Sequence, residues 1–205
     1  MDADNEHTVK TRWGTVVEDP PVARFLFDDT RLAAIWLAVR VLIGLVWLES
    51  ALGKLGNPAW IQTGEALKGF WERAAAVPDA PARPAIAFDW YRTFIQGLLD
   101  SGAYTWFAKL VAVGEFLIGV ALITGAFVGV AALFAAFMNW NFIMAGSAST
   151  NALLGLGAIL LVLAWKTAGY YGLDRYLLPR LGTPWSPRPR RVEMLPPAEQ
   201  EPSAA

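Results

Sequence analysis

The sequence predicts an all-α integral membrane protein, a bundle of four transmembrane helices with a long extracytoplasmic loop between the first and second helices. Of its 205 residues, 55% are hydrophobic and only 17% are charged, below the roughly 25% typical of soluble domains. The apolar residues are clustered in runs near the ~20 residues that a helix needs to cross a bilayer. The net charge of −1 gives no basic field for nucleic acid, so the expected partner is the lipid membrane.

The apolar runs define the four spans in chain order. We place them at about residues 32–53, 104–123, 127–145 and 152–171. Only Thr124, Gly125 and Ala126 separate the second run from the third. A turn this short predicts that these two helices form an antiparallel hairpin.

The interfacial loop at 54–103 contains two further predicted helices. In residues 60–76 the apolar and the polar side chains fall on opposite faces of a helix. This pattern is typical of an amphipathic helix at a membrane surface. Three prolines, at positions 78, 81 and 84, end it, and residues 86–99 are rich in aromatic side chains. We expect the first of these helices to lie in the interface or to cover one end of the bundle, and the second to lie in the interface. The alternative is a surface loop without function.

The distribution of Lys and Arg predicts the orientation. The N-terminal tail and the C-terminal side together carry ten, against six on the side of the long loop, which favours both termini in the cytoplasm. Residues 1–30 form a polar tail without the features of a signal peptide, so the first span is expected to remain as an anchor. Residues 31–179 form the membrane domain, and the Pro- and Arg-rich tail at 180–205 is predicted to be disordered.

Two charged residues lie near the middle of the apolar runs, Arg40 in the first and Glu115 in the second. A charge at the centre of a spanning helix costs at least ~2.5–3.5 kcal/mol, so such residues usually have a partner and often a function. Both are placed near the middle of their spans, and Gly119 would allow a neighbouring helix to approach closely. We therefore predict an Arg40–Glu115 ion pair as the catalytic centre. The alternative is a pair that only fixes helix packing.

Other polar and aromatic residues are predicted to surround this pair. At about 100° per residue, Trp36, Arg40 and Trp47 share one face of the first helix. Asn139 and Asn141 are about 200° apart, so only one of them is expected to face a cavity, and the other is expected to form a hydrogen bond between helices. The candidate substrate- or quinone-binding residues are Trp36, Trp47, Glu49, Lys54, Lys109, Asn139, Asn141 and Asn151.

The composition also restricts the cofactors that the chain itself can hold. There is no cysteine, and the single histidine, His7, lies in the N-terminal tail. We therefore expect no haem, iron–sulfur cluster or metal site within the bilayer, and no covalently bound cofactor. If electrons pass through the protein, an organic cofactor such as a quinone, or a partner protein, must carry them.

The order and spacing of several motifs resemble the DoxX/DoxD family of small four-helix membrane proteins. In the first span these are Arg40 and Gly44 followed by Ser-Ala-Leu-Gly-Lys-Leu at 50–55, and in the second Gly114-Glu115 followed by Gly119 and Gly125. The stretches 138–151 and 168–175 also resemble one branch of the family. The resemblance covers residues 31–179. It implies a multi-pass protein of a prokaryotic plasma membrane, with quinone-linked redox chemistry such as that of thiosulfate:quinone oxidoreductase.

Three functions remain open at this point. The first is a membrane subunit of a quinone-linked redox system, a possible oxidoreductase subunit in which Arg40 or an Asn donates to a quinone carbonyl and Glu115 or Glu49 transfers protons. The second is a non-enzymatic scaffold or accessory subunit that docks a partner protein or forms a homo-oligomer. The third is a small transporter, which ranks lowest because four spans without an internal repeat make alternating access difficult to build.

Overall fold

Helices make up most of the part of the chain that the computed structural model describes, residues 8–10 and 16–182. This part also contains an antiparallel pair of three-residue strands, β1 (Thr8–Lys10) and β2 (Val16–Glu18). The helices are α1 (Pro21–Ala23), η2 (Arg24–Asp28), η3 (Thr30–Leu32), α2 (Ala33–Leu55), α3 (Pro58–Ile61), α4 (Glu65–Ala75), α5 (Asp89–Asp100), α6 (Tyr104–Thr124), α7 (Val128–Met144), α8 (Asn151–Leu163), α9 (Trp165–Ala168) and α10 (Asp174–Arg180). The predicted all-α class is confirmed for the four long apolar elements.

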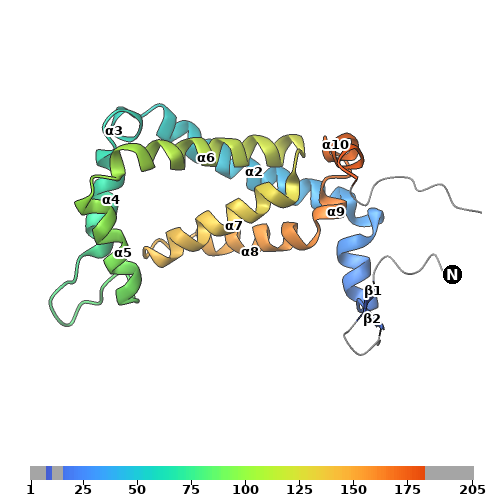
Figure 1. Cartoon of the computed structure of the whole chain (residues 1–205), viewed down its shortest axis with the longest axis horizontal. Coiled ribbons are helices and arrows are strands. Elements are labelled where there is room, and N and C mark those ends of the chain that lie inside the picture. Colours follow the sequence, from blue (N-terminus) through green and yellow to red (C-terminus); the bar gives the residue numbers. More distant parts are fainter. Residues whose placement is uncertain (1–7, 11–15, 183–205) are drawn as a thin grey trace, which may run out of the picture.

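Helices α2, α6, α7 and α8 form an elongated bundle (Figure 1). The most extensive contacts join α2 to α6 and α7 to α8. Gly44 and Gly119 bring α2 and α6 together, since a Cβ atom built on Gly119 would lie 2.8 Å from the Leu48 nitrogen and 3.0 Å from the Gly44 oxygen. Small residues at such a crossing allow two backbones to touch.

Two stretches are long and apolar enough to cross a membrane by length and composition, Thr30–Leu55 and Tyr104–Thr124. They correspond to the first and second predicted spans. The apolar helices α7 and α8 are shorter, with 17 and 13 residues. At 1.5 Å per residue, α7 is about 25 Å long, slightly less than the hydrocarbon core of a bilayer.

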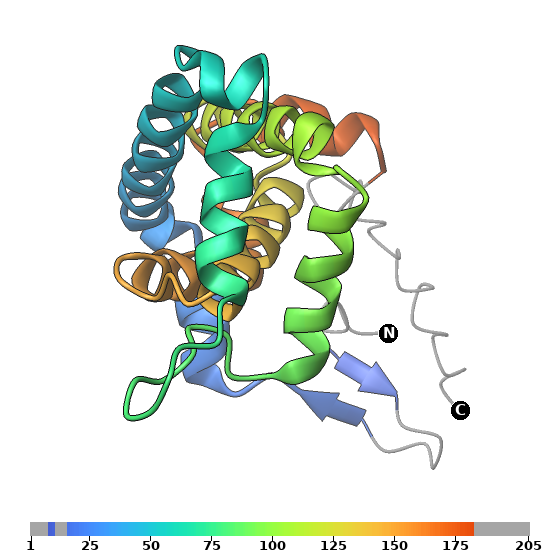
Figure 2. The same cartoon turned by 90° about the vertical axis from the view of Figure 1, so that its left-hand side faces the viewer.

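The α6–α7 hairpin opens from its turn. Gly125, with φ of +70°, makes the turn, as the short connection predicts, and from there α7 slopes away from α6 (Figure 1). Helices α4 and α5 pack on each other and run side by side across the open end (Figure 2). They match the two helices predicted in the loop, with α4 starting five residues later than expected.

Two apolar clusters of buried side chains stabilise this arrangement. One fills the bundle among α2, α6, α7 and α8 and includes Trp47, Leu122 and Leu161. The other joins α4 and α5 to the near ends of α6 and α7 and includes Trp71 and Tyr91. The four-helix bundle and its end cap, formed by α4 and α5, therefore have separate cores. The α6–α7 hairpin opens between these two cores.

The fourth predicted span, 152–171, is not one continuous helix. α8 ends at Leu163, and the chain turns at Ala164 before the short α9. This turn lets the Thr167 hydroxyl donate to the Phe27 carbonyl at 2.7 Å and Lys166 pair with Asp28 at 3.1 Å. Polar contacts with η2 thus replace the last turns of a straight helix. Most of the predicted C-terminal tail, from residue 183 onward, lies outside the described residues.

Candidate functional site

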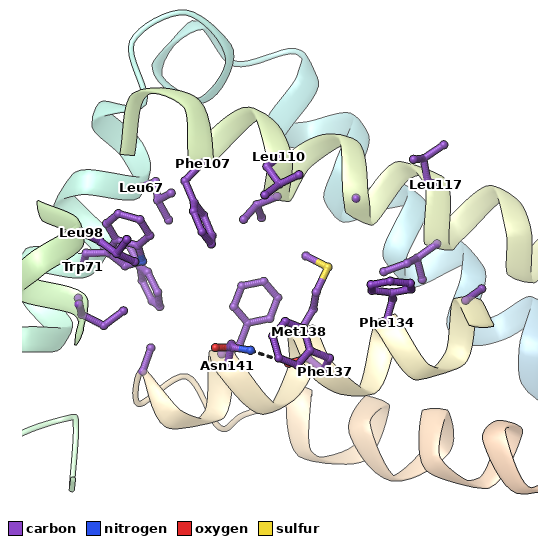
Figure 3. Close-up of a pocket in the computed structure, with 18 of the residues that line it drawn as sticks. Leu67, Trp71, Leu98, Phe107, Leu110, Leu117, Phe134, Phe137, Met138 and Asn141 are labelled. Atoms are coloured by element: carbon purple, nitrogen blue, oxygen red, sulfur yellow. Dashed lines mark hydrogen bonds between the residues drawn. The ribbon is translucent and has the colours of Figure 1, made fainter. Parts of the chain in front are cut away.

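A cavity of about 740 Å³ lies between α6 and α7 and is covered at one end by α4 and α5. In Figure 3 the Phe107 ring, the Met138 side chain and the Phe134 ring lie between the two helices, and Trp71 lies at the covered end. Trp71 and Phe107 make an edge-to-face contact with ring centroids 5.4 Å apart. A cavity of this size and composition matches the sites in which proteins hold small apolar ligands.

The cavity is open along the side of the bundle. Several of its lining residues are half exposed, among them Leu110 at 56%, Leu117 at 60%, Val130 at 54% and Phe134 at 57%. Leu110 and Leu117 belong to α6, and Val130 and Phe134 belong to α7. An apolar molecule could therefore enter sideways between the two helices.

Hydrogen-bonding side chains in the cavity are few and lie near α5. The Tyr91 hydroxyl on α5 donates to the Asn141 carbonyl at 3.1 Å and to Asn141 Oδ1 at 3.2 Å. Asn141 Nδ2 donates to the Phe137 carbonyl at 2.9 Å, the dashed line in Figure 3. This pair links the cap to α7.

Glu115 is 1% exposed and lies between α6 and α2, beside the cavity rather than in its wall. Its partner is Lys54, whose Nζ lies 2.7 Å from Glu115 Oε2 and also donates to the Ser50 hydroxyl at 2.6 Å. The same ammonium lies 5.2 Å from the centre of the Trp60 ring. Lys54 therefore neutralises the buried carboxylate and is itself held by three groups.

Arg40 lies at the other end of the bundle and bonds to backbone. Its guanidinium donates to the carbonyls of Leu122, Ile123 and Tyr171. The Leu122 and Ile123 carbonyls are among the last of α6, which have no partner within their own helix. The predicted Arg40–Glu115 ion pair is therefore wrong, because each charge has other partners in a different part of the bundle.

The register of α2 against α6 explains this error. Gly44 contacts Gly119, so Arg40, one turn before Gly44, lies level with Ile123. Glu115, one turn before Gly119, lies level with the next turn of α2, toward Ser50 and Lys54. Arg40 and Glu115 are thus separated by about two turns of helix, roughly 11 Å at the rise of an α-helix, and not at the common depth that the sequence suggested.

Asp174 is a second buried charge at the Arg40 end of the bundle. Its carboxylate accepts from the backbone N–H groups of Phe127 at 2.5 Å and Val128 at 2.8 Å, at the start of α7. Burial raises the pKa of Asp174, while these hydrogen bonds and the nearby Arg40 act in the opposite direction. Gly125 allows Arg40 and Gly172 to approach the turn closely. A Cβ atom at this position would lie 2.8 Å from the Arg40 guanidinium carbon and from the Gly172 Cα.

The buried aromatic and amide candidates do not gather around one ligand. Trp36 Nε1 donates to the Leu26 carbonyl at 2.8 Å, and Trp47 packs on Phe142 with ring centroids 6.4 Å apart. Asn139 Nδ2 donates to the Ala135 carbonyl of its own helix at 3.0 Å, so the predicted hydrogen bond to another helix is wrong. Trp47 Nε1 and Asn139 Oδ1 are buried without a partner. None of these three residues lines the cavity.

Of the eight predicted binding residues, only Asn141 lines the cavity. Glu49 and Lys109 are exposed on the outside of α2 and α6, and Asn151 Nδ2 donates to the Ser147 carbonyl at 2.7 Å in the α7–α8 connection. The aromatic walls that α4 and α5 give the cavity were not among the predicted binding residues. The available signal was the density of aromatic residues at 86–99, which was assigned to the membrane interface.

Within the described part of the chain, no group of three or more His, Cys, Asp or Glu side chains is arranged to hold a metal ion. No family model, curated protein or solved structure matches the chain. The resemblance to the DoxX/DoxD family therefore stays a prediction.

Proposed function

We propose that the protein is a multi-pass membrane protein that binds a lipophile between α6 and α7. The observation that carries this proposal is the cavity of about 740 Å³ with apolar and aromatic walls that opens sideways from the bundle. A water-soluble ligand would find few hydrogen-bonding partners there. An acyl chain, an isoprenoid or a quinone would bury its hydrocarbon surface at about 25 cal/mol per Å².

All four bundle helices cross the membrane in this proposal, with α8 and α9 together forming the fourth crossing. Support comes from the outward faces of the two shorter helices, which carry large exposed apolar side chains. On α7 these include Leu133 at 59% and Phe137 at 59% exposed, and on α8 Leu153 at 72% and Ile159 at 53%. Such a continuous apolar surface is stable in lipid and would promote aggregation in water. Both termini would then lie on one side, which the Lys and Arg distribution predicts to be the cytoplasm, and the family resemblance implies a prokaryotic plasma membrane.

A quinone is the ligand that the family resemblance favours, and the chain would then serve as the membrane subunit of a quinone-linked redox system. The cavity fits such a group, since aromatic walls suit the ring and the open side suits an isoprenoid tail. A bound quinone would supply the electron-accepting chemistry. Electrons would come from a partner protein or a soluble reductant, since the chain has no cysteine and its single histidine is His7.

An accessory role without redox chemistry is the second candidate, and the contacts of Arg40 favour it. All three hydrogen bonds of its guanidinium go to backbone carbonyls. This is the role of a residue that fixes helix ends. In this case the bundle would still bind a lipophile, as a structural lipid beside a partner protein or a second copy.

The test is to purify the protein in mild detergent, extract it, and identify bound lipophiles by mass spectrometry. Gly114→Phe is the blocking variant, because Gly114 lines the cavity and a Cβ there meets only Met138 Sδ, at 3.7 Å. Gly53→Phe adds the same ring where nothing lies within 4 Å and is the matched control. We expect a stoichiometric lipophile in the wild type and in Gly53→Phe and its loss in Gly114→Phe. Equal extracts from all three proteins would contradict the proposal.

The identity of the extracted lipophile separates the two roles. A quinone would support the redox subunit, and an ordinary membrane lipid would support the accessory role. Glu115→Gln is expected to retain the ligand, since Glu115 lies outside the cavity wall.

A further inference from the structure

The hydrogen-bonding side chains of the cavity are gathered at its covered end. Only three of the lining residues carry such a group, Trp71, Tyr91 and Asn141, and they come from α4, α5 and α7. Toward the α6–α7 turn the lining is aliphatic or aromatic, with Ile118, Ala121 and Val130 among the residues there. The cavity therefore has a polar end and an apolar end.

The Tyr91–Asn141 pair retains capacity for a ligand. Asn141 Nδ2 carries two N–H groups, and its recorded hydrogen bond to the Phe137 carbonyl uses one of them. The Tyr91 oxygen donates its proton to Asn141 and keeps lone pairs that can accept. Together they can donate one hydrogen bond to a ligand oxygen and accept one from a ligand hydroxyl.

No residue lining the cavity carries a formal charge. A carboxylate or phosphate placed there would lose its hydration without gaining a cation, at a high cost in free energy. Burial also raises the pKa of the Tyr91 hydroxyl, so this group stays neutral as well. The polar end therefore suits a neutral head group.

We infer that the cavity selects neutral lipophiles with a carbonyl or hydroxyl oxygen at one end, holding that oxygen at Tyr91 and Asn141 and directing the hydrocarbon body toward the α6–α7 turn. This inference rests on the proposed function, because it requires a lipophile in the cavity. It adds the head-group chemistry and the orientation. The charged head groups of fatty acids and phospholipids are excluded from this end, whereas ketones, quinones, long-chain alcohols and acyl esters are accepted.

The experiment measures direct binding of three tritiated compounds of equal chain length, an alkane, its methyl ketone and its carboxylate, to the detergent-solubilised protein by scintillation proximity. Wild type is expected to bind the ketone about tenfold more tightly than the alkane, the value of one hydrogen bond. The carboxylate is expected to bind most weakly. Asn141→Leu should bind the alkane as well as wild type does and should lose the preference for the ketone.

Tyr91→Phe is the second variant, since it keeps the ring and removes only the hydroxyl. It should reduce the ketone preference severalfold, because the Asn141 side chain loses the contact that holds it toward α5. Alkane binding by each variant reports that the cavity is intact. A ketone preference that is absent in wild type, or that survives in Asn141→Leu, would overturn the inference and leave the lipophile proposal standing. Failure of wild type to bind either neutral compound would overturn both.

Discussion

The two ends of the α6–α7 hairpin are built on opposite principles. At the turn, the buried charges of Arg40 and Asp174 bond to the backbone of α6, α7 and the segment before α10. At the open end, α4 and α5 close the bundle with aromatic and aliphatic side chains around a cavity. Buried charges therefore stabilise the turn of the hairpin, whereas the apolar core of α4 and α5 covers the other end, where the cavity lies.

The largest expected effect comes from removing Arg40. Arg40→Met would leave the buried Leu122 carbonyl and the partly buried Ile123 and Tyr171 carbonyls without this donor, at ~1–3 kcal/mol each. We expect a loss of about 5 kcal/mol, measured by thermal unfolding in detergent. Arg40→Lys keeps the charge, but its ammonium cannot reach all three carbonyls. Its melting temperature should therefore lie between those of wild type and Arg40→Met. A wild-type melting temperature in Arg40→Met would contradict the role of Arg40 in closing this end.

The Lys54–Glu115 pair provides the next test, because its two partners differ in exposure. Glu115 is 1% exposed and Lys54 18%. Lys54→Met strands a buried carboxylate and should cost about 3–5 kcal/mol. Glu115→Leu leaves an ammonium that can turn toward solvent and should cost less.

The double variant Lys54→Met/Glu115→Leu removes both charges of this pair. It should regain most of the stability that Lys54→Met loses, since no unpaired charge remains. Thermal unfolding of the four proteins gives the coupling energy of the pair. If Glu115→Leu is more damaging than Lys54→Met, Glu115 has a role beyond this pair.

The close α2–α6 contact can be tested with a single methyl group. In Gly119→Ala the new Cβ would lie 2.8 Å from the Leu48 nitrogen, so the helices must separate, at a cost of about 1–3 kcal/mol. Gly114→Ala is the control on the cavity side of the same helix, where the nearest atom is Met138 Sδ at 3.7 Å. Its melting temperature should be unchanged or higher. Equal effects of the two variants would argue against the Gly44–Gly119 crossing.

The smallest expected effect is the pH dependence contributed by Asp174. Because its pKa in the folded protein is raised above the ordinary value of 3.8, the folded state binds the proton more tightly than the unfolded state does. This group therefore stabilises the fold most below pH 3.8, and the contribution is lost as the pH rises through the folded pKa.

Asp174→Asn removes this titration and keeps one acceptor for α7. At acidic pH this variant should lower the free energy of unfolding by about 0.5–2 kcal/mol, because the hydrogen bonds that cap the start of α7 are weakened. The melting temperature of Asp174→Asn relative to wild type should then rise as the pH increases from 4 to 7. A relative melting temperature that falls over this range would reverse the assigned direction of the pKa shift.

The sequence predicted the elements of this fold better than their contacts. Apolar runs placed α2, α6 and α7, because each is long and uninterrupted, and the brief connection around Gly125 placed the hairpin. The partners of Arg40 were not predictable in this way. They depend on the register that Gly44 and Gly119 impose on two antiparallel helices, and a shift of two turns changes which groups meet.

The cavity was beyond sequence reasoning for a related reason. It arises from the angle at which α7 leaves α6 and from the docking of α4 and α5 across the gap. Each lining residue by itself, such as Phe107 or Phe134, resembles an ordinary lipid-facing or core residue. Among the lining residues, only Asn141 was one of the predicted binding residues.

The cavity between α6 and α7 is tested most directly by measuring the shape of the hairpin in a membrane. The chain has no cysteine, so pairs of introduced cysteines can be spin-labelled without background and their separation measured by double electron–electron resonance in nanodiscs. Val120 with Val130 reports on the closed end, and Thr105 with Ile143 on the open end, all at exposed positions. We predict a clearly longer distance for the Thr105–Ile143 pair than for the Val120–Val130 pair. Equal distances would mean that α6 and α7 pack along their whole length, and would contradict the cavity.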